Sequence, residues 1–146
     1  SSKRDELTAE SVLVSATFVT LSAVLTRAAS NSVGLFPNLA NPVSAGSAVA
    51  LCLMLVIDVT DYRYKAAVQG AIGQGSFTGM ASTQRLSASG VLAAGLIGGG
   101  LNAALHPFFL GFGGKQGFTA FLSCLPVLLL QASWKIARDR RVNVES

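Results

Sequence analysis

Few side chains in this sequence could do chemistry, and most of them lie within or beside apolar runs. His106 is the only histidine and follows Asn102 by four residues in GLNAALHP. A neutral imidazole can ligate the magnesium of a chlorophyll or the iron of a haem, but an imidazole at a helix end commonly bonds water, a lipid headgroup or a carbonyl group. We predict three candidate contacts of a pigment, such as chlorophyll or carotenoid, or of a structural lipid: His106, Asn102 and Gln131.

Catalytic and metal-binding chemistry has little support. Cys52 and Cys124 lie in separate apolar runs without CxxC spacing, so we interpret them as small buried side chains. A single histidine is too few for a zinc site of the usual composition or for a haem held by two histidines of this chain. None of the seven carboxylates lies deep in an apolar run, although Glu10 and Asp58 come nearest. We therefore predict no enzyme activity and no metal site.

The composition indicates a membrane protein. Of the 146 residues, 51% are hydrophobic and only 12% are charged, and the mean hydropathy is +0.53. Soluble domains carry roughly 25% charged residues. The formal net charge of +4 needs no nucleic acid to explain it, because the basic residues flank apolar runs, where they can meet lipid headgroups.

Four apolar runs approach the roughly 20 residues that cross a bilayer as a helix. We predict an all-α membrane protein with one domain over 1–146 and spans at about 11–29, 43–59, 86–105 and 117–136. Asn41 and Pro42 suit the cap and first position of the second span. The connection from 66 to 85 holds neither a GxGxxG fingerprint nor a Walker loop, and we expect a short surface helix or an irregular docked segment there.

Four spans would place both termini on one side, which the distribution of basic residues can test. Two of the eleven Lys and Arg, Arg27 and Lys115, then fall on one side, and the other nine fall on the side of the termini. This bias predicts that both termini face the cytoplasm, matrix or stroma. Aromatic and basic residues at the ends of spans are typical membrane anchors, and we assign this role to Tyr62, Tyr64, Trp134 and Lys135.

Small residues recur at helical spacing in the first and third spans. In a bilayer such stripes let helix backbones approach closely, since no hydrophobic force drives helices together. The candidate packing residues of the first span are Ser11, Ser15 and Ser22, and those of the third are Gly90, Ala94, Gly98, Gly95 and Gly99. The row from Gly90 to Asn102 at four-residue steps drifts by about 40° a step. Protein packing is the favoured interpretation, and a flat cofactor or a lipid is the alternative.

These features favour a non-catalytic accessory subunit of a larger energy-transducing membrane complex, of photosystem or respiratory type, whose partners are other membrane subunits and lipids. The alternative is a small oligomeric transporter or channel protomer. Four short spans resemble the architecture of small multidrug exporters, but their membrane-embedded glutamate has no counterpart beyond the shallow Glu10. From its first residues, SSKRDELTAE, we expect no secretory signal. We expect an organellar inner or thylakoid membrane rather than a bacterial inner membrane.

Overall fold

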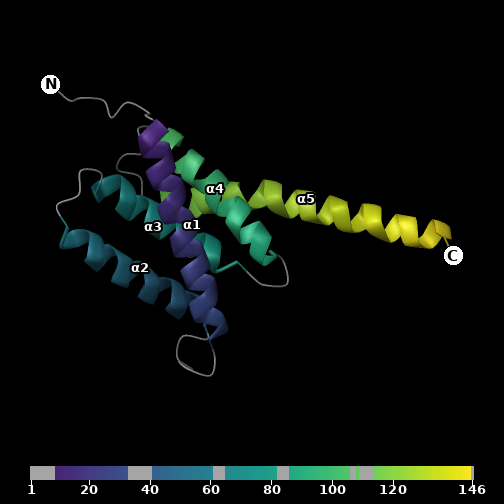
Figure 1. Cartoon of the computed structure of the whole chain (residues 1–146), viewed down its shortest axis with the longest axis horizontal. Helices are drawn as coiled ribbons and strands as arrows, with labels where there is room; N and C mark the ends of the chain where they lie inside the picture. Colours follow the sequence, from purple (N-terminus) through teal and green to yellow (C-terminus); the bar gives the residue numbers. More distant parts are fainter. Residues whose placement is uncertain are drawn as a thin grey trace.

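The computed structural model describes residues 9–32, 41–60, 65–81, 86–105, 108 and 114–145, and the regular secondary structure in these residues is helical. Figure 1 shows the arrangement of its helices, and none of these residues belongs to a strand. The helices are α1 (Ala9–Asn31), α2 (Pro42–Asp58), α3 (Lys65–Gly79), α4 (Ala88–Leu105) and α5 (Lys115–Glu145).

Three of these helices are long and apolar enough to cross a membrane: α1, α4 and the Lys115–Arg141 part of α5. The α2 helix is also apolar but shorter, with 17 residues. The chain is therefore consistent with an integral membrane protein. The predicted spans at 11–29, 43–59, 86–105 and 117–136 correspond to α1, α2, α4 and α5, but the count of four spans and the placement of the termini are not confirmed.

Polar side chains fix where two of the helices begin. Asn41 precedes α2, and its side-chain oxygen accepts a hydrogen bond from the amide of Val43 at 2.9 Å, while Pro42 occupies the first helical position. Ser87 precedes α4, and its hydroxyl oxygen accepts from the amide of Gly90 at 3.1 Å. Both arrangements satisfy amides that have no partner within the helix.

Glycines bring α4 against α1 at backbone distance. A Cβ atom added to Gly99 would overlap the Cα of Ala16, and one added to Gly95 would lie 2.9 Å from the Cα of Thr20. Because residue numbers rise along α4 as they fall along α1, the two helices are antiparallel. Four alternating spans would instead make the helices at 11–29 and 86–105 parallel.

The α3 helix packs on another side of α1 through a second glycine pair. Added Cβ atoms at Gly75 and Gly79 would overlap the carbonyl oxygens of Val19 and Ala23 respectively. Residue numbers rise together along α1 and α3, so these helices run in the same direction. The sequence predicts a short surface helix or an irregular docked segment here, whereas most of α3 from Val68 to Gly79 is buried.

The remaining contacts complete an alternating pattern. Met80, just after α3, lies against Gly46 near the start of α2, so α2 and α3 are antiparallel. Gln131 of α5 bonds Ser87 at the start of α4, whereas Ser123 lies beside Gly98, so α4 and α5 are also antiparallel. The five helices thus alternate in direction from α1 to α5.

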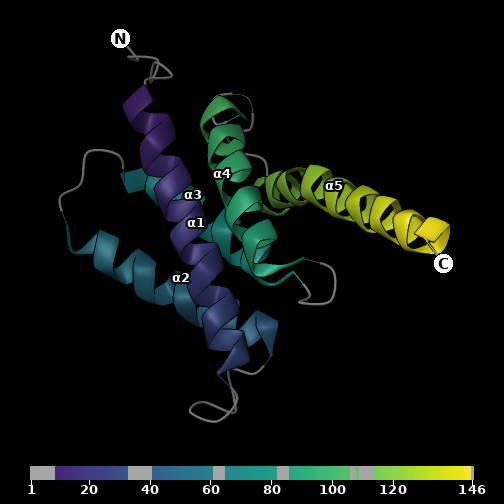
Figure 2. The same ribbon diagram turned by 45° about the vertical axis from the view of Figure 1, so that its right-hand side comes forward.

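The C-terminal half of α5 extends away from the other helices, as Figures 1 and 2 show from two sides. Only 17% of its apolar window is buried inside the bundle, against 39% for α4. The helix continues through Pro126 to Glu145. Its surface must therefore be covered by something other than this bundle.

Candidate functional site

Uncharged polar side chains are buried inside the bundle, mostly where α3 meets α1, α4 and α5. No charged side chain of the described residues is buried to the same degree. The interior therefore offers hydrogen-bond donors and acceptors without an ionisable group. Its buried polar residues are Ser15, Ser22, Thr26, Gln74, Ser76, Thr78, Asn102, Thr119 and Ser123.

Several of these hydroxyl groups are satisfied by nearby backbone. The Ser22 hydroxyl of α1 donates to the carbonyl oxygen of Ile72 in α3 at 2.8 Å and lies 3.0 Å from the Ser76 hydroxyl. The Thr78 hydroxyl donates to the carbonyl oxygen of Gln74 at 3.1 Å. The two Ser22 contacts stabilise the packing of α1 on α3, whereas the Thr78 bond lies within α3 and satisfies a buried hydroxyl that would be costly to leave unpaired.

Gln74 is the largest buried polar side chain and crosses from α3 to α4. Its Nε2 donates to the carbonyl oxygen of Gly98 at 3.0 Å, and the residue is 0% exposed. Its Oε1 has no hydrogen-bond partner in the part of the chain that the structure describes. Gln74 was not among the predicted site residues, because it lies in a glycine-rich segment outside the apolar runs.

Asn102, a predicted pigment or lipid contact, faces the same interface. It is 7% exposed, and its Oδ1 lies 3.8 Å from the position that a Cβ of Gly70 would take. Its Nδ2 has no hydrogen-bond partner among the described residues. The α3 helix therefore covers the side chain on this face.

Gln131, the second predicted contact, lies at the other end of α4. Its Nε2 donates to the Ser87 hydroxyl at 2.6 Å, and the side chain is partly exposed. Ser87 and Asn102 are separated along α4 by about 22 Å at 1.5 Å per residue. The structure thus separates these two candidates and gives Gln131 a helix-packing contact.

The other candidate residues fall into two groups. His106, Tyr62 and Tyr64 lie outside the described residues. Trp134 and Lys135 are exposed in the C-terminal half of α5, where Trp134 has 75% of its surface accessible.

The predicted packing residues lie mainly at helix contacts. Ser15, Ser22 and all five small residues of α4, Gly90, Ala94, Gly95, Gly98 and Gly99, are buried, whereas Ser11 is partly buried near the start of α1. The α4 residues do not share one partner. Gly99 faces α1, Gly98 faces Gln74 of α3, and Gly90 faces Gln131 of α5.

Arg27 ties three parts of the chain together near the end of α1. Its Nη1 donates to the carbonyl oxygen of Ala81 at 2.7 Å, and its Nη2 donates to the carbonyl oxygen of Leu86. The planar guanidinium presents its donors in a fixed fork that suits two acceptors. One side chain therefore fixes the end of α3 and the start of α4 against α1.

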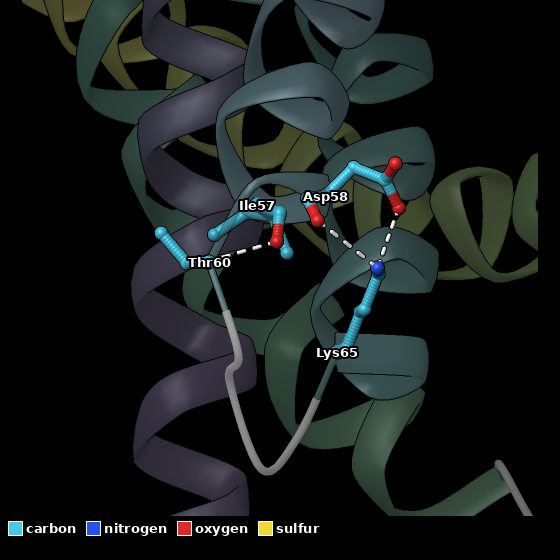
Figure 3. A network of polar contacts seen from close by, with 4 residues as sticks. All are labelled: Ile57, Asp58, Thr60 and Lys65. Carbon is cyan, nitrogen blue, oxygen red and sulfur yellow. Dashed lines mark hydrogen bonds and ion pairs between the residues drawn. The ribbon is translucent and has the colours of Figure 1, made fainter.

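The described residues hold no group of three or more His, Cys, Asp or Glu that could bind a metal ion. Asp58 at the end of α2 and Lys65 at the start of α3 form the ion pair drawn in Figure 3. Lys65 Nζ lies 2.5 Å from Asp58 Oδ1 and also donates to the Asp58 carbonyl oxygen at 3.2 Å, while Thr60 bonds the carbonyl oxygen of Ile57. The ion pair and the Lys65 hydrogen bond join the end of α2 to the start of α3.

Replacing Lys65 with alanine should change the free energy of unfolding by less than about 1 kcal/mol. The two side chains are 40% and 61% exposed, and exposed ion pairs contribute little. Denaturation of the detergent-solubilised chain, followed by circular dichroism, measures the change, with Asp58→Ala as the matched substitution. A loss of several kcal/mol in either variant would contradict a purely superficial role for this pair.

No protein-family model matches this chain, and no curated protein or solved structure was found to match it.

Proposed function

We propose that this chain is a non-catalytic accessory subunit of a larger energy-transducing membrane complex, in an organellar inner or thylakoid membrane. The exposed apolar surface of α5 carries this proposal. Seven large hydrophobic side chains along α5 are more than a third exposed: Phe118, Phe121, Leu125, Leu129, Leu130, Trp134 and Ile136. Neighbouring membrane subunits and lipids would cover this surface.

The chemistry of the described residues supports a role in assembly. Their buried side chains are uncharged, and the partly buried Arg27 contacts two backbone carbonyl groups. Of the three predicted pigment contacts we retain His106, because Asn102 faces α3 and Gln131 bonds Ser87. A structural lipid along α5 fits the same proposal.

Extraction in mild detergent, native electrophoresis and an absorption spectrum of the band test this function. An accessory subunit should migrate with a large complex that carries chlorophyll or haem. A small colourless band would contradict the proposal. Substrate flux into liposomes would then be the next measurement.

A photo-cross-linker at Leu129 should give a discrete adduct with another protein subunit in the native membrane. Leu51 of α2 is the matched control, because both leucines are 60% exposed. We expect a lipid adduct alone at Leu51, since α2 packs against both α1 and α3. Lipid adducts alone at both positions would count against α5 as the subunit contact.

The alternative function is that of an oligomeric transporter or channel protomer, which the buried polar interior favours. Such an interior could line a path for a neutral solute. Proton-coupled transport normally uses an ionisable group inside the membrane, and no such group is buried among the described residues. Flux of a neutral solute that falls with Gln74→Met would support this alternative.

For the topology, we propose that α3 is a fifth membrane-embedded segment, so that the termini lie on opposite sides. The alternating helix directions support this arrangement. The contact of Arg27 with Leu86 also supports it, because it joins two regions that four spans would place on opposite sides. The nine-to-two distribution of Lys and Arg was counted for four spans, and that count requires these two regions to lie on opposite sides.

Single cysteines at Thr60 and Ala88 should react with a membrane-impermeant maleimide from opposite sides of sealed vesicles. Both positions are exposed, and Cys52 and Cys124 are first replaced with alanine. A cysteine at Ser44, at the other end of α2, is the control, because it lies opposite Thr60 in both topologies. Labelling of Thr60 and Ala88 from the same side would establish four spans.

A further inference from the structure

Two primary amides occupy adjacent turns of the α3–α4 interface. Gln74 reaches the carbonyl group of Gly98, and Asn102 lies one turn further along α4, opposite Gly70. Four residues separate Gly98 from Asn102, which corresponds to about 6 Å along the helix axis. The two amides therefore belong to one region of the interior.

Each amide keeps one atom without a hydrogen-bond partner among the described residues. The unpaired atom of Gln74 is the acceptor Oε1, and that of Asn102 is the donor Nδ2. Both residues are more than nine-tenths buried. Leaving such a group unpaired inside a protein costs about 1–3 kcal/mol, so two unmatched groups of opposite kind indicate a shared partner.

We propose that Gln74 and Asn102 bind a water molecule between α3 and α4. The water donates a hydrogen bond to Gln74 Oε1 and accepts one from Asn102 Nδ2. Two hydrogen bonds of about 2.8 Å span roughly the length of one helical turn. A neutral ligand fits the site because no charged side chain is buried among the described residues. This internal site goes beyond the proposed role as a subunit.

Nuclear magnetic resonance of the full chain in lipid nanodiscs, with ¹⁵N-labelled asparagine, tests this site directly. The side-chain amide of Asn102, identified by its loss in Asn102→Leu, should show a rotating-frame Overhauser cross-peak to water. The peak should weaken at least about fivefold in Gln74→Met and persist in Gln131→Met, the matched glutamine control. Absence of the peak in the native chain, or its persistence in Gln74→Met, would overturn the proposal.

A double-substitution cycle provides a second measurement. If both substitutions displace the same water molecule, the second substitution should cost less once the first has been made. The effect of Asn102→Leu on the unfolding equilibrium constant should be roughly two- to tenfold smaller in a Gln74→Met background. In a Gln131→Met background it should stay unchanged within about twofold. Independent effects of Gln74→Met and Asn102→Leu would show that the amides share no ligand. Neither measurement depends on association with a larger complex.

Discussion

Gly99→Ala should lower the free energy of unfolding by about 1–3 kcal/mol, which is the usual cost of adding volume to a well-packed interior. The added Cβ would overlap the backbone of Ala16, so α1 and α4 would have to move apart. Because α3 also packs on α1, the substitution should weaken the contact between α1 and α3 as well as the contact between α1 and α4. Titration of the detergent-solubilised chain with sodium dodecyl sulfate, followed by circular dichroism, measures the change.

The adjacent glycine supplies the control for this effect. A Cβ at Gly100 would meet no atom within 4 Å, so Gly100→Ala should be neutral or slightly stabilising. The two variants share composition, helix and depth, and they differ in what the new methyl group meets. Equal stabilities of the two variants would show that the close approach of α4 to α1 does not limit stability.

The drift of the small-residue row on α4 was predictable from its four-residue period. Each step of four residues turns by about 40° beyond a full rotation, and the partners change accordingly. Gly90 meets α5, Gly98 meets Gln74 of α3 as well as Ser123 of α5, and Asn102 lies opposite Gly70 of α3. The partner of each small residue was not predictable, because it depends on the directions in which the helices run.

The α3 helix was not predicted as a buried element because hydropathy detects segments that face lipid. Four glycines lie among its 15 residues, which include the buried polar residues Gln74, Ser76 and Thr78. Because neighbouring helices cover most of α3, its surface does not have to be apolar. The four-residue spacing of Gly75 and Gly79, which both meet α1, was the available signal for close packing.

The candidate site was only partly accessible from the sequence for a related reason. Asn102 and Gln131 stood out as polar residues within apolar runs, but the fold places them at opposite ends of α4. Asn102 faces α3, where the buried amide is that of Gln74, and this glutamine comes from a segment without an apolar run. Which side chains meet in the interior depends on the relative directions and register of the helices. The sequence of one apolar run gives neither.

Arg27→Ala should lower the free energy of unfolding by about 2–3 kcal/mol, the cost expected for hydrogen bonds from a charged group. The substitution would remove the donors to the carbonyl oxygens of Ala81 and Leu86. Its effect should appear first as loosening between α3 and α4, because Arg27 joins the end of one to the start of the other. Hydrogen exchange of the amides at the start of α4 measures that loosening.

Arg27→Lys keeps the positive charge but cannot reproduce the paired hydrogen bonds of the guanidinium group, so it distinguishes the two contributions to stability. A lysine ammonium is a compact charge without the guanidinium fork, so this variant should recover less than half of the lost stability. Arg138→Ala on the exposed end of α5 is the matched control, and it should change stability by no more than about 0.5 kcal/mol. Full recovery by lysine would mean that charge at the membrane surface, rather than the fork between two carbonyl groups, accounts for the role of Arg27.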